Sequence, residues 1–367
     1  MSSTPPAPSH AAHDHTPETH GAGEHGPDHG DGLRGARAPG RVRALLAGTV
    51  LIAGLAIIRV VAPATGGVEL ADLVQDFVTL SVAIVIESFP FVILGIAISV
   101  LVQIWVPRRI LLRLLPTHPI PRRFVMSVLG ILLPVCECGN VPLSRGLIVR
   151  GVSVPEAMTF LVAAPIVNPV TIITTYQAFG FDDGILLGRI LGGLAIANLV
   201  GWLFSKHPDP QSLLTRRFAA TCTVAHAERD EAPERSRARR SAALFAEEST
   251  DLLPALLIGA AIAGVLQVAV SRDILIALGA NPVWSVLALM LLGFVVALCS
   301  TVDAFFILAF ASTFSPGAIV AFLVFGPIID IRMLALLRTT FTARALLLLT
   351  AVVALATMAL GFGMNLV

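Results

Sequence analysis

The sequence predicts an all-α, polytopic membrane protein built from two homologous halves. Of its 367 residues, 56% are hydrophobic and only 13% are charged, whereas an ordinary soluble domain carries about 25% charged residues. The apolar residues also fall into about eight runs of roughly 18 to 30 residues, each long enough to cross or deeply enter a hydrocarbon core about 30 Å thick. These observations exclude a soluble enzyme, a secreted domain and a nucleic-acid-binding protein, and they make the lipid bilayer the first expected partner.

Residues 1–43 are expected to form a disordered, His-rich cytoplasmic tail, because the segment is rich in His, Pro, Gly and Asp and has almost nothing apolar to bury. Imidazole groups suit zinc, copper and nickel, so this tail is a candidate for metal binding. An uncleaved transmembrane anchor is expected at 44–62, because a long polar leader precedes the run and no small-residue cleavage site accompanies it. The histidines of the tail are His10, His13, His15, His20, His25 and His29.

Two blocks of apolar runs follow, and they predict transmembrane repeats at 72–205 and 246–367. Residues 206–245 are polar, Arg-rich and without periodicity, which predicts a mobile cytoplasmic linker between the repeats. The runs of the first repeat are 77–106, 124–150, 155–179 and 185–204, and those of the second are 252–270, 283–314, 316–337 and 343–362.

The second half repeats the first at an offset of 161 to 164 residues. PFVILG at 90–95 matches PALLIG at 254–259, and FLVAAPIVN at 160–168 matches FLVFGPIID at 322–330. A match between two apolar hexamers is expected by chance, but four markers in order at one offset predict an internal duplication. The other two markers pair Cys136 with Cys299 and Pro155 with Pro316.

The distribution of basic residues favours halves that are inverted relative to each other. If all four runs of a half crossed the membrane, the basic segments 107–123 and 206–245 would lie on opposite sides, against the positive-inside rule. The conflict disappears if 124–150 is a re-entrant hairpin with its tip at 134–142, which leaves three crossings per half. Inverted repeats with broken helices meeting at the midplane recur in secondary transporters. Eight plain crossings in parallel repeats are the alternative. In the second half, the inverted scheme places Arg332, Arg338 and Arg344 on the cytoplasmic side.

The densest group of reactive side chains is Pro-Val-Cys-Glu-Cys-Gly-Asn-Val-Pro at 134–142. Two prolines and a glycine are not expected to continue a regular helix, and irregular backbone at membrane depth is tolerated only against protein or a water-filled cavity. Cys136 and Cys138 are soft ligands, and Glu137 and Asn140 add oxygen atoms beside them. We therefore expect this loop to contribute to a binding site.

Further ionisable groups lie inside the apolar runs. Burying Glu137 would cost at least a few kcal/mol without a partner or a cavity, and Arg145 is its expected counter-charge if the loop folds back. Cys299 and Asp303 belong to a stretch with one thiol, two hydroxyls and a carboxylate. An acid in such a position is by default a functional candidate.

Prolines interrupt the third run of each half at Pro165 and Pro327. Asn168 and Asp330 bring an amide and a carboxylate to the same depth, so both are candidates for substrate contact. We identify no phosphate-binding loop, dinucleotide fingerprint or Ser/His/Asp arrangement in the sequence. The prediction is therefore a protein that is not an enzyme, has no cofactor and does not itself hydrolyse ATP.

The motif CECGNVP at 136–142, together with Pro155 and FLVAAPIVNPVT at 160–171, resembles the predicted-permease family that includes the ArsP organoarsenical exporters. The resemblance covers about residues 75–365 and implies a polytopic permease, with Cys136 and Cys138 as contacts for a thiophilic cargo. This sequence departs from the exporter pattern in having Glu137 between the thiols and Gly-Asn after them, where small hydroxyl residues are expected. A divalent metal such as zinc therefore stands beside trivalent arsenic as the expected cargo.

We expect a multi-pass permease of the cell membrane that moves a soft metal or metalloid by a secondary mechanism, with its N-terminus and linker in the cytoplasm. Acidic residues would balance charge or carry a coupled proton. The expected partners are a small inorganic or organometallic substrate, and a second copy of the chain or an accessory subunit. The alternatives are a membrane thiol-disulfide redox carrier that uses the strained CxC pair and a non-transporting subunit of a membrane complex. The candidate substrate-binding residues are Cys136, Glu137, Cys138, Asn140, Arg145, Asn168, Cys299, Asp303 and Asp330, and the candidate metal ligands are Cys136, Cys138 and Cys299.

Overall fold

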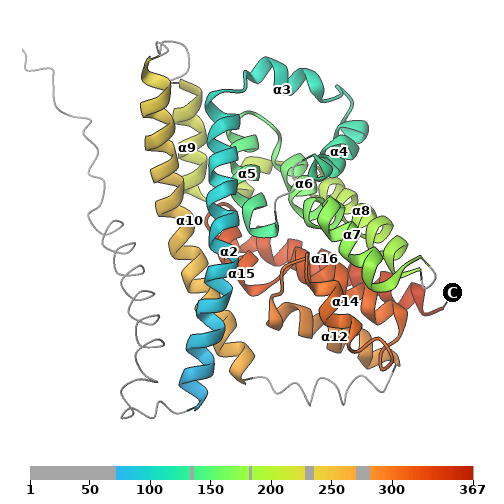
Figure 1. Cartoon of the computed structure of the whole chain (residues 1–367). Helices are drawn as coiled ribbons and strands as arrows, with labels where there is room; N and C mark the ends of the chain where they lie inside the picture. The colour runs from blue at the N-terminus through green and yellow to red at the C-terminus, as the bar shows by residue number, and fades with distance from the viewer. Residues whose placement is uncertain (1–71, 133–135, 182–183, 228–234, 270–281, 367) are drawn as a thin grey trace, which may run out of the picture. The chain divides into compact units, whose positions relative to one another are not determined.

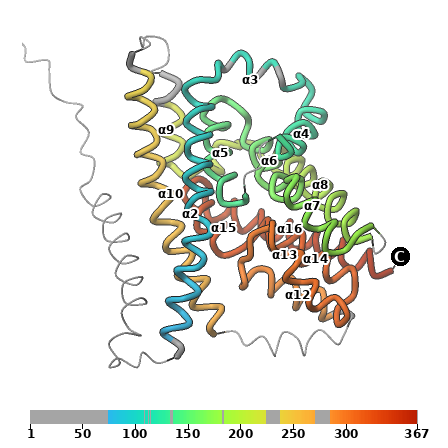
Figure 2. The backbone as a smooth tube through the Cα atoms, viewed as in Figure 1, coloured from blue at the N-terminus to red at the C-terminus, as the bar shows by residue number. Residues whose placement is uncertain are grey.

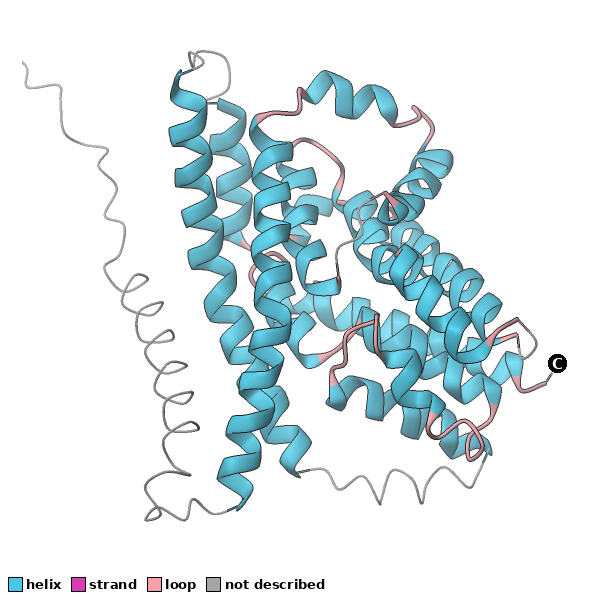
Figure 3. Ribbon diagram, viewed as in Figure 1, coloured by secondary structure: helices cyan, strands magenta, loops and turns pink. Residues whose placement is uncertain are grey.

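The computed structural model describes residues 72–132, 136–181, 184–227, 235–269 and 282–366. Within these ranges the chain forms helices joined by loops, and they contain no strand (Figure 3). The all-α fold predicted from the sequence is confirmed. The His-rich tail and the anchor predicted at 44–62 lie outside the described residues.

The helices of the first half are α2 (Asp72–Ile104), α3 (Arg108–Leu114), α4 (Pro119–Val128), η1 (Leu129–Ile131), α5 (Glu137–Val149), α6 (Val154–Val167), α7 (Pro169–Phe179) and α8 (Ile185–Phe204). The connection between the halves contains η2 (Pro210–Leu213) and α9 (Arg216–Ala227). The helices of the second half are α10 (Arg235–Ala269), α12 (Pro282–Val296), α13 (Asp303–Leu308), α14 (Pro316–Ile328), α15 (Ile331–Leu337) and α16 (Ala343–Met364).

Six of the described helices or helix pairs are long and apolar enough to cross a membrane. They are α2, α6 with α7, and α8 in the first half, and α10, α14 with α15, and α16 in the second. The apolar segments 124–150 and 283–314 are not among them, because their described helices are short: α4, η1 and α5 in the first segment, and α12 and α13 in the second. Each half therefore contains three candidate spans.

The two broken spans form the interior of the helical assembly. For the α14–α15 span, 89% of the apolar window is buried, and for the α6–α7 span 72%, against 33% for each of α10 and α16. Each break follows a proline, at Pro165 or Pro327, and ends at a residue that caps the next helix. Asn168 accepts a hydrogen bond from Val170 N at 3.0 Å, and Asp330 accepts one from Met333 N at 2.6 Å. The interruptions predicted from the sequence are therefore present in both halves.

Corresponding helices of the two halves have corresponding neighbours. In the first half α6 packs against α4 and α8, and in the second half α14 packs against α12 and α16. The shorter helices make reciprocal contacts between the halves, because α5 lies against α15 and α13 lies against α7 (Figure 2). A short helix of each half therefore lies against the broken span of the other half.

The long helices α2 and α10 lie side by side, and α5 packs along α2 (Figure 1). Close approach of α5 to α2 requires glycine: a Cβ atom added at Gly95 would lie 2.6 Å from the Cα atom of Gly139. Because Gly139 is in the first turn of α5, this contact fixes the start of that helix.

The connection between the halves differs from the prediction of a mobile linker over its described part. The segment contains η2 and α9, and α10 already begins at Arg235. Thr215 N donates to Thr340 O at 2.8 Å, and Thr342 N donates to Leu213 O at 2.9 Å. The Arg- and Ala-rich stretch has good helix propensity, and its contacts with α5 and with 340–342 give it a fixed place that its polar composition does not suggest.

Replacing Gly95 with alanine should lower the stability of the protein by about 1 to 3 kcal/mol, because the new methyl group forces α5 away from α2. Gly363 is the matched control, since it lies in α16 and a Cβ atom there meets nothing within 4 Å. Thermal unfolding of the purified variants in detergent measures the difference. Equal midpoints for Gly95→Ala and Gly363→Ala would show that the α2–α5 contact is not tight.

Candidate functional site

The Cys-Glu-Cys motif lies at the N-terminus of α5. Cys136 precedes the helix with an extended backbone, and Glu137 and Cys138 occupy its first turn. The expectation that the motif interrupts the helix is wrong beyond Cys136, because the chain is helical through Pro142 to Val149. Pro142 has no N–H group, so the carbonyl of Cys138 lacks its usual intrahelical donor. The motif thus presents two thiols, a carboxylate and an open backbone acceptor.

The loop between α12 and α13 supplies the opposite wall of the site. Ala297, directly after α12, has a φ of 50°, a left-handed conformation that is uncommon for a residue with a Cβ atom. The chain then turns so that the carbonyl of Cys299 accepts a hydrogen bond from Asp303 N at 3.2 Å, where α13 begins. This geometry directs Cys299 and Ser300 toward the start of α5.

The two loops bring thiols and a carboxylate together. The Sγ atoms of Cys136 and Cys299 and a carboxylate oxygen of Glu137 all lie within 4.8 Å of one another, and Cys138 follows Glu137 in the first turn of α5. Glu137 Oε2 lies 3.8 Å from Cys299 Sγ and accepts hydrogen bonds from the backbone N of Ser300 at 3.4 Å and from its hydroxyl at 3.2 Å. All four side chains are buried. We call Cys136, Glu137, Cys138 and Cys299 the thiol cluster.

Arg332 is the counter-charge of the thiol cluster. Its Nη2 lies 3.3 Å from Glu137 Oε1 and 3.1 Å from Asp330 Oδ2, and its Nη1 donates to Ser88 Oγ at 2.9 Å. Both Arg332 and Glu137 are 1% exposed at the side chain. We expected Arg332 on the cytoplasmic side, as one of three basic residues; the structure shows that its side chain is buried in an ion pair. The ion pair instead joins α5 of the first half to α15 of the second.

A second buried ion pair lies beside the first. Arg189 of α8 pairs with Asp303 of α13, at 2.6 Å from Oδ2 and 3.0 Å from Oδ1, and also donates to Thr175 Oγ1 at 2.7 Å. Its Nη2 reaches the carbonyl of Ser300 at 3.4 Å, and the hydroxyl of Ser300 lies 3.3 Å from that of Thr171 in α7. Through Ser300, the two ion pairs and the thiol cluster form one buried polar network.

Arg145 does not reach Glu137, so that predicted pairing is wrong. In a regular helix, a residue eight positions along lies about 12 Å away along the axis, and α5 does not fold back. Arg145 Nη2 instead pairs with Asp251 at 3.2 Å, and its guanidinium lies 4.6 Å from the centre of the Phe218 ring. It belongs to a different cluster at the other end of α5.

Two of the predicted site amides have different environments. Asn168 is buried and acts as the N-cap of α7, where its Oδ1 accepts a hydrogen bond from Val170 N. Asn140 lies one turn along α5 from Glu137, is 0% exposed, and both its Oδ1 and Nδ2 lack a hydrogen-bond partner among the described residues. Asn140 therefore offers a donor and an acceptor beside the thiol cluster. The substrate-binding roles of all nine predicted residues stay predictions.

Sequence reasoning missed Arg189 as a member of the site and misplaced Arg332. Both lie inside apolar runs, and the rule that intramembrane ionisable residues are functional candidates could have found them. Their partners could not be found in the same way, because Arg189 lies 114 residues from Asp303, and Arg332 lies 195 residues from Glu137.

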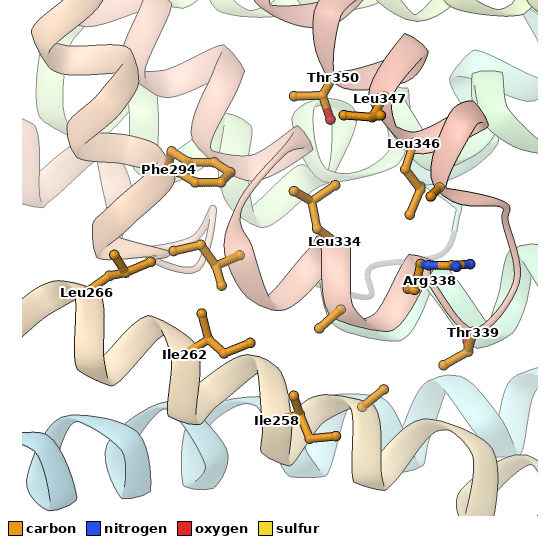
Figure 4. Close-up of a pocket in the computed structure, with 14 residues that line it drawn as sticks. Ile258, Ile262, Leu266, Phe294, Leu334, Arg338, Thr339, Leu346, Leu347 and Thr350 are labelled. Carbon is orange, nitrogen blue, oxygen red and sulfur yellow. The ribbon is translucent and has the colours of Figure 1, made fainter.

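A cavity of about 780 Å³ lies apart from the thiol cluster, between α10, α15 and α16 (Figure 4). Its lining is almost wholly apolar, for example Ile258, Leu334 and Leu347, with Arg338 and Thr339 as polar members. The cavity offers no thiol or carboxylate to a metal. Within the described part of the chain, the thiol cluster is therefore the candidate site for a soft metal or metalloid.

Replacing Arg332 with methionine should destabilise the protein by about 3 to 5 kcal/mol, because Glu137 and Asp330 would remain buried without their guanidinium partner. Arg338→Met is the matched control, since Arg338 is exposed and should change stability by no more than about 0.5 kcal/mol. Adding Glu137→Gln to Arg332→Met should restore part of the loss. Denaturant unfolding in detergent micelles measures all three, and an Arg332→Met variant as stable as Arg338→Met would contradict the assignment.

Comparison with known proteins finds one matching family and several individual relatives. Residues 73–366 match a family described as a predicted permease, ArsP_1. UPF0718 protein YcgR of Bacillus subtilis is 33% identical over 283 residues, which cover 73% of this chain and 90% of that protein. A Streptococcus mutans protein is named as a subunit of a two-component membrane permease complex. It is 29% identical over 279 residues, which cover 76% of this chain and 91% of that protein.

A shorter match joins this chain to UPF0718 protein YraQ of Escherichia coli, which is 31% identical over 118 residues, or 31% of this chain and 32% of that protein. No solved structure matches the chain significantly. The family match extends from α2 to α16, so it includes both loops of the thiol cluster and the six candidate spans found among the described residues. The chain belongs to this predicted-permease family and is a multi-pass membrane protein.

Proposed function

We propose that this permease moves a thiophilic metal or metalloid across the membrane and binds it at the thiol cluster. The observation that carries the proposal is the convergence of soft ligands from both halves: Cys136 and Glu137 from the first, and Cys299 from the second, lie within 4.8 Å of one another. A site at the interface of two repeats can open to either side when the repeats move relative to each other. The buried position of the ligands agrees with such an occluded site.

The donor set fits a soft cargo. A zinc–sulfur bond is about 2.3 Å long and zinc sites are tetrahedral, so two sulfur ligands of one ion lie about 3.8 Å apart. The three ligand atoms lie within 4.8 Å of one another, so the two loops would move about 1 Å closer when the ion binds. Thiols bind such species as thiolates, and Glu137 Oε2, at 3.8 Å from Cys299 Sγ, is positioned to accept the proton that the thiol gives up.

The charges of the polar network limit what the site can hold. Arg189 and Arg332 face three carboxylates, those of Glu137, Asp303 and Asp330, so the network carries one excess negative charge when all five groups are ionised. A divalent ion would need at least one thiolate in addition, whereas a neutral trivalent arsenical exchanges a hydroxyl group for each thiolate. Asn140 supplies hydrogen-bonding atoms to a hydroxylated species. Zinc and trivalent arsenic are thus both compatible cargoes.

We further propose that the two halves are inverted, with 124–150 and 283–314 as re-entrant hairpins and with the N-terminus and the connection between the halves in the cytoplasm. Three candidate spans in each half support this topology. Ser300 lies 163 residues after Glu137, which is the offset of the internal repeat, and the two side chains touch. Equivalent residues that touch must lie near the axis relating the two copies, as expected where two hairpins meet.

An accessory subunit is the partner that the comparisons favour. The Streptococcus mutans relative is named as a subunit of a two-component membrane permease complex, and most of its length aligns with this chain. We propose that this chain is likewise the membrane-embedded subunit of such a pair and contains the cargo site. Purification without the partner would then give a protein that binds cargo.

Replacing Cys136 or Cys299 with serine should lower cargo binding at least tenfold, because serine is a poor ligand for soft ions. Cys222→Ser in α9 is the matched control and should bind as the wild type does. Binding and flux are measured in proteoliposomes with zinc, copper, arsenite and methylarsenite, with and without a proton gradient. Undiminished cargo binding in both cluster variants would refute the site. If cargo moves only while electrons pass to a thiol partner, the thiol-disulfide redox carrier is favoured instead.

Topology is tested by single cysteines placed in exposed loop positions of the Cys222→Ser background. Thr117→Cys and Ser205→Cys should react with a membrane-impermeant thiol reagent from the same side, and Phe181→Cys from the other. Mass spectrometry of labelled peptides from right-side-out and inverted vesicles reads the result. If Thr117→Cys and Ser205→Cys label from opposite sides, residues 124–150 cross the membrane and the inverted arrangement is wrong.

A further inference from the structure

A second buried polar cluster lies where α2, α5, α9 and α10 meet, apart from the thiol cluster. Its central residue is Glu248 of α10, which is 5% exposed. Glu248 Oε1 accepts hydrogen bonds from Gln103 Nε2 at 2.6 Å and Ser99 Oγ at 3.2 Å, both from α2. We call this group the α10 cluster; its members are Ser99, Gln103, Arg145, Arg217, Glu248 and Asp251.

The carboxyl group of Glu248 has no ion pair within the described part of the chain. The two arginines that face this region both bind Asp251 directly: Arg145 Nη2 lies 3.2 Å from Oδ2, and Arg217 Nη2 lies 2.5 Å from Oδ1. Arg145 also attracts the carboxylate of Glu248, but without forming an ion pair with it. Glu247, the adjacent acid on α10, is exposed. Ser99 and Gln103 are neutral donors, so no group that hydrogen-bonds to Glu248 carries a positive charge. An ionised carboxylate in this position is costly to bury.

The second oxygen of Glu248 is open to a small cavity. Oε2 is buried and has no hydrogen-bond partner among the described residues, and the same is true of Arg145 Nε. Both residues line a cavity of about 10 Å³, together with Gln103, Phe218 and Asp251. A cavity of about 10 to 15 Å³ holds one water molecule. A single water molecule here can donate to Glu248 Oε2, accept from Arg145 Nε, and exchange protons with the carboxyl group.

The α10 cluster is mechanically linked to the helix that carries the thiol motif. Ser99, which donates to Glu248, lies directly against α5, because a Cβ atom added at Gly146 would be 2.6 Å from Ser99 Oγ. Arg145, the neighbour of Gly146, contributes to the same cavity. Glu137 is the first residue of α5 and lies at the opposite end of this helix from Arg145 and Gly146. A change in hydrogen bonding at Ser99 is therefore transmitted to a helix whose first turn forms the cargo site.

We propose that Glu248 is the proton-binding residue of the transport cycle. It takes a proton from water at Oε2 in one conformation of the α2–α5–α10 contact and returns it to water in another. Loss of the proton leaves a full negative charge on Glu248, which strengthens its hydrogen bonds from Ser99 and Gln103 and from the cavity water. The packing of α5 against α2 then changes with the charge of Glu248. The inference rests on the proposed transport function, but its proton-binding step is measurable without cargo.

The test compares Glu248→Gln with Glu247→Gln. Glutamine keeps the acceptor for Ser99 and Gln103 but cannot gain or lose a proton, and Glu247 is an exposed acid on the same helix. In proteoliposomes loaded with radiolabelled zinc or arsenite, Glu248→Gln should abolish the stimulation of flux by a proton gradient while exchange without a gradient stays within about threefold of wild type. Glu247→Gln should keep the stimulation. A Glu248→Gln variant with the gradient response of wild type overturns the proposal.

A second measurement uses the wild-type protein without cargo. Dicyclohexylcarbodiimide adds to protonated carboxyl groups in apolar surroundings to give a stable N-acylurea, so mass spectrometry of the labelled protein should find Glu248 modified and Glu247 unmodified, with labelling that falls as the pH rises. Absence of labelling at Glu248 over the whole pH range overturns proton binding. If the wild type moves neither zinc nor arsenite but Glu248 is labelled in this way, the cargo assignment fails and proton binding stands.

Discussion

The structure depends on the buried contact between Arg332 and Glu137. The pair joins the first turn of α5 to the first turn of α15, and so connects the two halves of the chain beside the thiol cluster. Neither group could stay charged in an apolar interior without the other, and Asp330, Ser88 and Ser300 satisfy their remaining hydrogen-bonding positions. The ion pair therefore fixes the orientation of Glu137, and with it the distance from the carboxylate to the thiols of Cys136 and Cys299.

The residues that meet at the site correspond to each other in the sequence repeat. Cys136 lies beside Cys299, and Glu137 lies beside Ser300. Two glutamates in contact would repel each other, whereas glutamate beside serine accepts a hydrogen bond. The caps of the broken spans also differ, with Asn168 in one half and Asp330 in the other. Of these two caps, Asp330 is the one with an arginine two residues along the chain, and the two side chains form an ion pair.

Much of this architecture could be predicted from the sequence, and the failures have clear physical causes. Hydropathy predicted an all-α membrane fold, and the described helices include three candidate spans in each half. The repeat paired Cys136 with Cys299, and their thiols lie close together. Side-chain partners could not be predicted in the same way, since Arg332 and Arg189 pair across more than a hundred residues. Arg145 was assigned to Glu137 by proximity along the chain, but the rise of a helix separates them. The connection at 206–245 was expected to be irregular from its polarity, yet tertiary contacts hold its described part as helix.

The central claim is that a soft cargo binds the sulfur atoms of both halves at once. X-ray absorption spectroscopy of the purified protein loaded with zinc or arsenite measures the cargo's ligands directly. The account predicts at least two sulfur ligands, at about 2.3 Å for zinc, and the loss of one of them in the Cys299→Ser variant. A first shell of oxygen and nitrogen alone, or a sulfur count unchanged by Cys299→Ser, would contradict it.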